Sequence, residues 1–438
     1  MLKVAKFGGS SVAGADQFKK VKAIIQEDPA RRIVIVSAAG KRSSSDHKLT
    51  DLLYLCHAHL TYGVPGDNIL QLIQDRFAEI RSDLGLQYDV ESDFAALRSR
   101  LSRDATADEL VSRGEYFTAR LMAEYLDYDF VDAADCVFFG FDGQLDLEKT
   151  YAAIKEAAAK GRGIVIPGFY GSLPSGKIRV MSRGGSDISG ALAAAAVDAD
   201  VYENWTDVSG ILMADPRIVK DPAPIEYITY SELRELAFMG ASVLHEDSVQ
   251  PVKDKGIPLN IRNTNRPQDA GTMIVEKISK KSANQDRFIT GIAGRRNFTI
   301  LTLRKRNMNL NVTLSQVLKI LERSHITAEH ITLGLDSFAL VVSSAVLGDR
   351  LYEIIGEVQN VCAPDDIQVQ DQVALVAVVG RKMTYRPGTS GKIFRALGDA
   401  GINIRTINQA ADEISITVGV DNNDFETAIR VLYDGFAG

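Results

Sequence analysis

The sequence is poor in cysteine, with three cysteines in 438 residues. They stand at positions 56, 136 and 362, and none has a second cysteine or a histidine at the spacing of a metal ligand. This distribution indicates neither a disulfide framework nor a zinc site. A reducing cytoplasm is therefore the expected compartment.

Long apolar runs and an excess of positive charge are also missing. No run approaches the roughly 18 consecutive apolar residues of a membrane-spanning helix, and Met1–Phe7 lacks the apolar core of a signal peptide. The 57 acidic and 50 basic side chains give a net charge of −7, which argues against a general nucleic-acid binder. We expect neither nucleic acid nor a membrane as a partner, while a small anion in a locally basic pocket stays open.

The chain that is present is long enough for two or three domains. Up to about residue 285, β-branched runs alternate with segments of helical period, as at Ile33–Val36, Gly163–Ile166 and Pro258–Ile261. Phe18, Val21 and Ile25 mark one face of a helix near the N-terminus. This alternation predicts an α/β layered domain with a mainly parallel central sheet.

The remaining residues contain an internal duplication. A shift of 76 positions superposes apolar residues in the two copies: Leu321 on Leu397, Ile326 on Ile402, Ile331 on Ile407, and Phe338, Leu340 and Val342 on Ile414, Ile416 and Val418. Each copy reads as a strand, a loop, a helix, two strands and a second helix. The sequence therefore predicts two small α+β modules, which follow a polar linker at residues 277–286.

A first candidate binding turn is Lys6–Ser11, where a predicted strand meets two glycines, two serines and then a helix. Glycines let backbone N–H groups approach an anion, a helix N-terminus adds partial positive charge, and Lys6 adds a full one. The turn has the outline of a phosphate site, although the lysine precedes the glycines, unlike the Walker pattern. A tight turn with a serine cap explains the same residues.

A second glycine turn, Met181–Asp187, leads into a helix of small residues that ends near Ala196. Arg183 has the fork geometry to hold a carboxylate, and Asp187 suits the first turn of the helix. Helix capping alone explains this turn equally well. The two turns together, one with lysine and one with arginine, favour an anion site.

Further polar segments follow other predicted strands. Tyr202–Gly210 and then Ala214–Arg217 read as a strand followed by a long polar loop that holds the only tryptophan. Open parallel sheets place ligands in loops at strand ends, although Asp-Pro is also ordinary turn chemistry. Ser37–Lys41 ends another strand. Glu115 opens a predicted helix, and in a pocket its carboxylate would need a cationic partner such as a substrate ammonium.

Together these segments closely resemble the aspartokinases of the amino-acid kinase family, and the duplicated tail resembles their paired ACT domains. The motifs that carry the resemblance run in the family's order: Lys6–Val12, Arg183–Asp187, Trp205–Val208 with Asp215–Arg217, and Gly240–His245. The resemblance implies a three-layer kinase domain over residues 1–285. It also implies ferredoxin-like ACT domains over residues 286–372 and 373–438.

The resemblance further implies transfer of the ATP γ-phosphoryl group to the side-chain carboxylate of L-aspartate, the first step of lysine, threonine and methionine biosynthesis. Lys6 would be catalytic, with the backbone at Gly8 and Gly9, and Asp187 would orient it. The implied aspartate-binding residues are Ser10, Ser37, Thr50, Glu115, Phe169, Arg183 and Ser186. Beyond Lys6, Gly8 and Gly9, the implied ATP-binding residues are Thr206, Asp207, Arg217 and Ser242.

This chemistry needs positioning and charge neutralisation rather than a strong base, because a carboxylate is already nucleophilic. We expect Mg²⁺ to arrive with ATP, held largely by phosphates and water, and we predict no protein metal site. A homodimer through the ACT domains and a lysine or threonine effector at them are also implied.

The sequence departs from the family pattern in two places. Ser242 stands where relatives commonly have lysine, and Asn309–Leu314 lacks a glycine found in lysine-inhibited relatives, while Glu329 replaces an aspartate. Two alternatives follow. The chain could be a catalytically weak amino-acid sensor on the same fold, or a kinase for another acceptor such as glutamate, acetylglutamate, carbamate or UMP.

Overall fold

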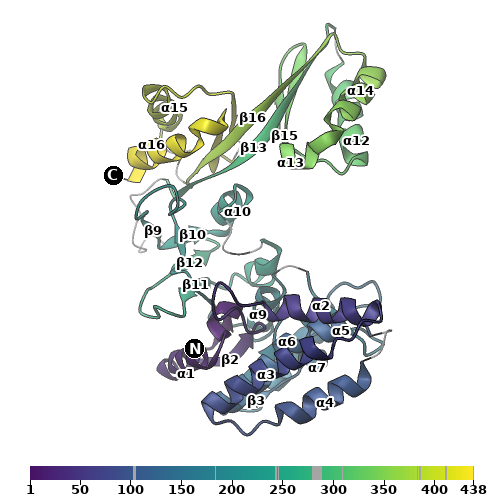
Figure 1. Ribbon diagram of the computed structural model, residues 1–438. Helices are drawn as coiled ribbons and strands as arrows, with labels where there is room; N and C mark the ends of the chain where they lie inside the picture. Colours follow the sequence, from purple (N-terminus) through teal and green to yellow (C-terminus); the bar gives the residue numbers. More distant parts are fainter. Residues whose placement is uncertain are drawn as a thin grey trace. The chain divides into compact units, whose positions relative to one another are not determined.

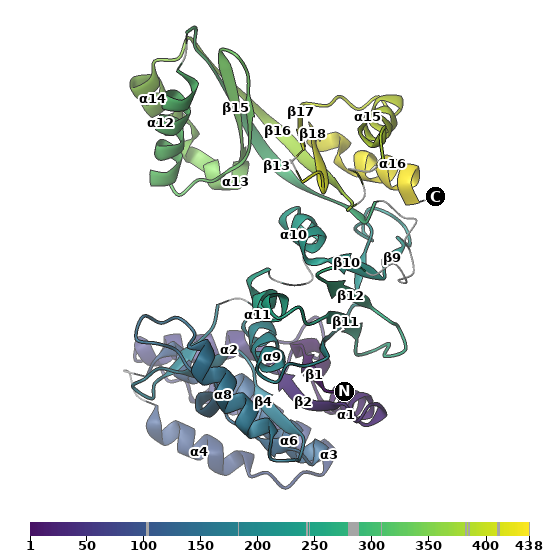
Figure 2. The same cartoon turned by 180° about the vertical axis from the view of Figure 1, so that it is seen from behind.

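The computed structural model describes residues 1–101, 105–182, 184–241, 244, 246–278, 289–307, 309–381, 383, 386–409 and 412–437. The chain forms two compact units, drawn as ribbons in Figures 1 and 2. The first unit comprises Met1–Ile211, Pro224–Tyr230 and Val243–Asn284; the second comprises Leu212–Ala223, Ser231–Ser242 and Gln285–Gly438. The predicted domain limits at residues 285 and 372 stay predictions.

The first unit is built on an eight-stranded sheet in the order β10-β12-β11-β7-β1-β2-β4-β3. Its strands are β1 (Lys3–Phe7), β2 (Arg31–Val36), β3 (Asp129–Phe130), β4 (Ile164–Pro167), β7 (Val201–Thr206), β10 (Tyr227–Thr229), β11 (Leu259–Asn263) and β12 (Thr272–Val275). Every neighbouring pair is parallel except β11 with β12. The predicted strands around residues 33, 163 and 258 are thus confirmed.

Helices cover both faces of this sheet. One face carries α1 (Ala15–Glu27), α3 (Asp67–Leu84) and α6 (Arg113–Leu126), whose apolar residues share a buried core with Phe7 and Trp205. The other face carries α9 (Gly185–Ala196), which packs against α8 (Leu147–Ala158) and α11 (Gln250–Asp254). The predicted three-layer α/β architecture is confirmed.

Shorter elements complete the first unit. They are η1 (Gly9–Val12), α2 (Leu49–Thr61), α4 (Val90–Arg100), α5 (Ala107–Val111), α7 (Ala133–Cys136), β5 (Tyr170–Ser172), β6 (Ile178–Val180), β9 (Pro224–Ile225) and η2 (Glu246–Val249), while β8 (Ile211–Leu212) straddles the two units.

The second unit contains a six-stranded antiparallel sheet in the order β14-β15-β13-β16-β18-β17. The first copy of the repeat supplies β13 (Gly291–Arg304), α12 (Leu310–Arg323), β14 (Ala328–Leu333), β15 (Ser337–Ser343), α13 (Ser344–Leu347), η3 (Gly348–Arg350) and α14 (Leu351–Cys362). The second copy supplies β16 (Asp366–Val379), α15 (Thr389–Asp399), β17 (Thr406–Gln409), β18 (Ser415–Asp421), η5 (Asn422–Asp424) and α16 (Phe425–Ala437). The predicted pair of α+β modules is confirmed. Most of α10 (Tyr230–Phe238) also belongs to this unit.

Each of the two long strands, β13 and β16, contributes to both modules. The first half of β13, Gly291–Arg295, pairs with the second half of β16, and Ile292 lies in the core of the C-terminal module. The second half of β13, Phe298–Arg304, pairs with β15 and with the first half of β16. The offset of 76 residues could not show this exchange, because it aligns the two copies but does not tell which strands pair across the sheet.

Within the described residues, no helix is both long and apolar enough to cross a membrane. The three cysteines are all free thiols in buried positions.

Candidate active site

Four neighbouring parallel strands of the first unit end at one edge of the sheet. Phe7 of β1 pairs with both Val36 of β2 and Trp205 of β7, and Val36 pairs with Pro167 of β4. Ligands bind at such carboxyl ends in open α/β sheets. The edge therefore gathers the predicted residues that follow these ends: Gly8, Gly9, Ser10, Ser37, Phe169, Thr206 and Asp207.

The ammonium group of Lys6 lies beside Asp187, with 2.5 Å between Nζ and Oδ1, and both side chains are largely buried. Asp187 comes from the first turn of α9, which packs on the face of β1 that carries Lys6. Asn204 of β7 joins the pair, since its Nδ2 donates to Asp187 Oδ1 at 2.9 Å and its Oδ1 accepts from Lys6 Nζ at 3.5 Å. A single buried ammonium is thus held in place at the strand ends.

The glycine turn after Lys6 packs tightly against the loop that follows β2. The Gly8 N–H donates to the carbonyl of Trp205 at 2.9 Å, and the Gly40 N–H donates to the carbonyl of Gly9 at 2.8 Å. A side chain at Gly40 would stand 2.5 Å from the backbone carbon of Gly9. The helix predicted after the glycines and serines is confirmed as α1, which begins at Ala15, and residues 9–12 form a short 3-10 turn before it.

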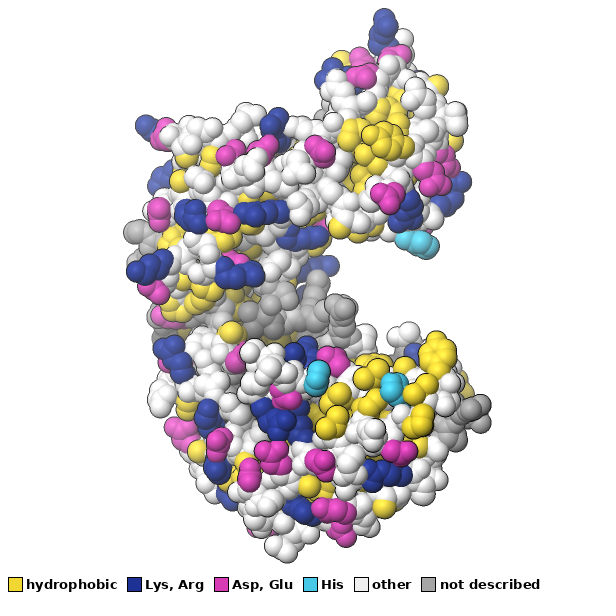
Figure 3. All heavy atoms as spheres, in the orientation of Figure 1, with side chains coloured by type: hydrophobic (Ala, Val, Ile, Leu, Met, Phe, Trp, Pro, Cys, Tyr) yellow, Lys and Arg dark blue, Asp and Glu magenta, His cyan; other side chains and the backbone are white. Residues whose placement is uncertain are grey.

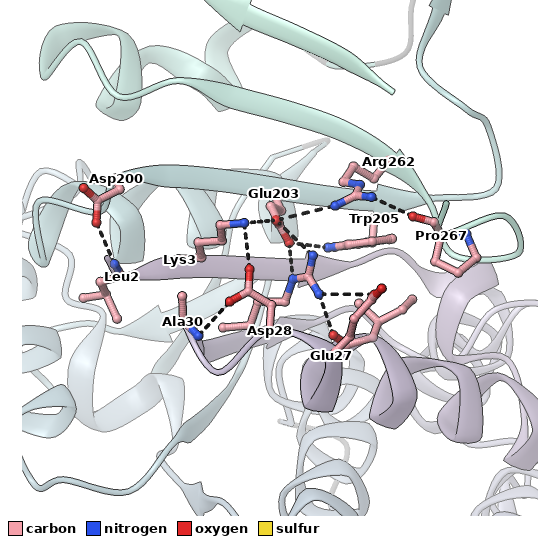
Figure 4. Close-up of polar contacts among 12 residues, drawn as sticks. Leu2, Lys3, Glu27, Asp28, Ala30, Asp200, Glu203, Trp205, Arg262 and Pro267 are labelled. Carbon is pink, nitrogen blue, oxygen red and sulfur yellow. Dashed lines mark hydrogen bonds and ion pairs between the residues drawn. The ribbon is translucent and has the colours of Figure 1, made fainter. Parts of the chain in front are cut away.

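A buried ionic cluster lies on the opposite face of β7 (Figure 4). The Glu203 carboxylate accepts from Arg31 Nε at 2.7 Å and from the Trp205 indole N–H at 2.9 Å, and Lys3 approaches to 3.2 Å. Arg262 adds a fourth contact at 3.9 Å. The buried carboxylate is thus fully paired. Because it binds the Trp205 side chain, the cluster helps to hold the Trp205 carbonyl that accepts the hydrogen bond from Gly8.

Glu115, in the first turn of α6, is a buried carboxylate next to the same loops. Burial raises the pKa of Glu115 to about 8, against the opposing effects of the backbone N–H groups of Ala38 and Glu115 and the charge of Arg113. Its Oε2 atom has no hydrogen-bond partner among the residues that the structure describes. An unpartnered buried carboxylate oxygen is suited to a bound cationic group.

Other predicted substrate residues lie in neighbouring loops and helix ends of the first unit. Phe169 has a positive φ of 79° and its N–H donates to Ser189 of α9. Ser186 packs so closely on Gly168 that a Cβ there would lie 2.8 Å from that of Ser186. Thr50 lies in the first turn of α2, a helix whose Leu53 contacts Gly114, the neighbour of Glu115.

The predicted nucleotide residues divide into two groups. Thr206 and Asp207 lie at the end of β7, where Asn263 of β11 donates to the Asp207 carbonyl at 3.2 Å. Arg217 belongs to the second unit, where its exposed guanidinium pairs with Asp215 at 2.6 Å. The predicted Arg183 and Ser242 lie outside the described residues.

Two functional candidates escaped sequence reasoning. Asn204 immediately precedes the Trp205–Val208 motif and is the residue of β7 that pairs with Lys6 of β1. Paired residues of neighbouring strands point to the same face of a sheet, so knowing that β1 pairs with β7 would have identified Asn204. Asn263 is the last residue of β11, and no local pattern distinguishes it from an ordinary strand end.

The site residues suit a metal that arrives with its ligand. In the described ranges, no three His, Cys, Asp or Glu side chains converge as metal ligands. Among the described residues, Asp207 is a carboxylate that follows β7 at this edge of the sheet and would be able to contact a Mg²⁺ ion bound to a nucleotide. Mg²⁺ commonly takes one or two carboxylates and otherwise keeps phosphate oxygens and water.

Known proteins resemble this chain along its whole length. The amino acid kinase family model matches residues 1–263, and an ACT domain model matches residues 376–436. Aspartokinase 3 of Bacillus subtilis is 33% identical over 99% of this chain and 98% of its own. The crystal structure of Clostridium acetobutylicum aspartate kinase is 45% identical, covers 99% of both chains and has a TM-score of 0.92. Escherichia coli aspartokinase III, solved with aspartate and ADP, is 27% identical over the full length of both chains, with a TM-score of 0.75. This chain therefore belongs to the amino acid kinase family and, within it, to the aspartokinases.

Proposed function

We propose that the chain transfers the γ-phosphoryl group of ATP to the side-chain carboxylate of L-aspartate, giving 4-phospho-L-aspartate. The observation that carries this proposal is the backbone of Ala38. Its N–H bonds the Glu115 carboxylate, while its carbonyl lies against Gly9, 2.9 Å from where a Cβ would stand. Ala38 thus connects Glu115, which would bind an ammonium group, with the glycine turn at Gly9, which would bind a phosphate.

The assigned roles follow from charge. Glu115 holds the ammonium of aspartate, Ser10, Ser37 and Thr50 border its carboxylates, and Lys6 faces the phosphate oxygens from its place beside Asp187. Lysine and backbone N–H groups offset negative charge that spreads over the phosphate in the transition state. Thr206 and Asp207 hold the nucleotide, and Mg²⁺ adds further neutralisation on the phosphates.

The relatives support this substrate choice. The Escherichia coli enzyme was solved with aspartate and ADP in one state and with lysine and aspartate in another. We accordingly place this chain at the head of lysine, threonine and methionine biosynthesis, with lysine or threonine as the effector. The three buried free thiols suit the reducing cytoplasm.

Trapping the acyl phosphate with hydroxylamine tests the reaction directly. With MgATP, aspartate should give the hydroxamate at a rate at least about 100-fold above glutamate, because a pocket built to pair all three charges of aspartate leaves groups unpaired with a longer acid. Adding lysine or threonine to parallel wells identifies the effector. No hydroxamate from aspartate, with a known aspartokinase active in the same plate, would contradict the proposal and favour the sensor.

We also propose that the chain forms a homodimer through its ACT modules. The edge strand β14 exposes Ile331 and Leu333, with Leu335 beyond it, and the repeat-related Ile407 is exposed on the other edge strand, β17. Hydrophobic side chains also gather beside α12 in Figure 3. Apolar edge strands pair readily between subunits unless they are covered.

Charge on the β14 edge should therefore separate the subunits. We expect Leu333→Lys with Leu335→Lys to convert a dimer to a monomer in sedimentation velocity, because two buried ammonium groups would face the partner. Tyr352→Lys, which changes an exposed aromatic residue on α14, is the matched control. A dimer that survives the double substitution would place the interface elsewhere.

A further inference from the structure

Arg76 is a buried arginine in the middle of α3, and the residue is only 4% exposed. Its neighbours on the helix, Ile73, Phe77 and Ile80, are core residues of ordinary kind. An apolar side chain at position 76 would extend that core without the cost of burying a charge. The guanidinium therefore needs an explanation beyond packing.

The contacts of Arg76 supply one. Nη1 donates to the carbonyl of His47 at 3.1 Å, and Nη2 donates to the carbonyl of Ala13 at 3.3 Å and to that of Gly40. Asp46 completes the set as an ion pair at 3.3 Å. One rigid planar group thus satisfies three backbone carbonyls and a carboxylate, an arrangement that lysine cannot reproduce.

The three carbonyls belong to segments that border the proposed active site. Ala13 follows the glycine turn of residues 8–12, and Gly40 packs on Gly9 at the end of the loop that begins with Ser37. His47 lies just before α2, whose first turn carries Thr50. Arg76 therefore joins the phosphate turn to both ends of the segment that carries Ser37 and Thr50.

Asp46 fixes the rest of this segment to the same helix. Its carboxylate accepts from the backbone N–H of Arg42 at 2.9 Å and of His47 at 3.0 Å, and from Arg42 Nε at 3.1 Å. Arg42 in turn pairs with Glu79, one turn after Arg76 on α3, at 2.6 Å. These contacts, with those of Arg76, hold the pKa of Asp46 well below its usual range. The segment from residue 40 to residue 47 is thus folded onto α3 by charged groups rather than by apolar packing.

We infer that Arg76 is a positioning residue for the aspartate pocket, acting through the carbonyls of Ala13, Gly40 and His47 to set Ser37 and Thr50 against the phosphate turn. The inference rests on the proposed function, because it takes aspartate as the ligand of Ser37 and Thr50. Arg76 does not touch substrate. Its removal changes where the binding groups stand, and a displacement of about 1 Å is enough to cost roughly 100-fold in rate.

The test compares steady-state constants of Arg76→Met and Arg76→Lys with those of the unchanged chain. We expect Arg76→Met to raise KM for aspartate at least about tenfold and to raise KM for MgATP by a clearly smaller factor. Arg76 reaches the nucleotide side only through the phosphate turn, whereas it holds both Gly40 and His47 in the segment that carries Ser37 and Thr50. Arg76→Lys should fall between, since one ammonium cannot serve three carbonyls. Arg81→Met is the control: it removes an arginine of the same helix, α3, that pairs with Glu91 of α4, and it should leave both constants unchanged.

KM separates positioning from mere destabilisation. A variant that only unfolds more easily loses active enzyme, which lowers the maximal rate but leaves KM for the remaining molecules unaltered. If Arg76→Met folds too poorly to measure, Asp46→Asn keeps the guanidinium and should raise KM for aspartate in the same direction by about threefold or more. An unchanged KM for aspartate in the measurable variants would overturn the inference. Absence of turnover in the unchanged chain would instead contradict the proposed function.

Discussion

Replacement of Lys6 by methionine is expected to lower kcat by about 10²- to 10³-fold while the protein stays folded. Removing one preorganised donor to developing negative charge costs about 2.7–4 kcal/mol in transition-state stabilisation. Lys6 is the buried ammonium held by Asp187 and Asn204 at the end of β1, so no neighbouring group in those contacts replaces it. Single-turnover hydroxamate formation with saturating MgATP and aspartate measures the loss.

Lys3→Met is the matched control for this substitution. Lys3 lies on the same strand but pairs with Asp28 and Glu203 on the other face of the sheet, as Figure 4 shows. It should reduce thermal stability with little effect on kcat. A Lys6→Met variant that keeps more than about a tenth of the activity would show that another cation carries the charge of the transferred group.

The alternation of apolar runs was sufficient to predict the architecture. Most of β2, from Ile33 to Val36, and all of β4 are continuous apolar runs, and helix α1 buries Phe18, Val21 and Ile25 on one face as its period indicates. The duplication likewise predicted two α+β modules, since its paired residues Leu321 and Leu397 are core positions in each; only the family resemblance identified them as ACT domains. These features are local, and period alone decides them.

Features that depend on long-range pairing could not be predicted in the same way. The pairing of β13 with β16 is irregular at the point where the strands pass from one module to the other. Asn297 and Gln372 have positive φ there, and the side-chain oxygens of both accept from Asn422 Nδ2. None of the three residues is unusual in its local sequence. Turn residues of this kind look alike whether they bend a strand or end it.

The candidate site shows the same division. Lys6 and Asp187 stand beside pairs of glycines, which are visible in the sequence. Arg76 lies in the middle of helix α3, where an arginine is ordinarily predicted to be exposed to solvent, although here it is buried. Asp46 lies in a serine-rich segment that resembles a loose connection. Buried polar contacts with distant backbone carbonyls leave no periodic signal, so only coordinates reveal them.

Substitution of Glu115 by glutamine is expected to weaken aspartate binding and to stabilise the protein at alkaline pH. A charge-assisted hydrogen bond contributes about 1.5–3 kcal/mol, so KM for aspartate should rise about 10- to 100-fold. The pKa of Glu115 is raised to about 8 by burial, from an ordinary value of 4.5. Since only the ionised carboxylate pairs with the substrate ammonium, 1/KM for aspartate should rise about tenfold per pH unit up to about pH 8. This pH dependence should vanish in the variant.

The stability effect has the opposite sign, because the folded state without substrate prefers the protonated acid. Between pH 4.5 and about 8 the folded chain binds more protons at Glu115 than the unfolded chain, so the free energy of unfolding falls as pH rises, by up to about 1.4 kcal/mol per unit. Glutamine removes this loss, and Glu115→Gln should therefore melt above the unchanged protein at pH 8.5 but not at pH 4.5. At the same aspartate concentration, the melting temperature should rise more for the unchanged chain than for Glu115→Gln, because the substrate ammonium compensates the buried charge that glutamine lacks. A variant less stable than the unchanged chain at pH 8.5 would mean that Glu115 is already paired before substrate binds.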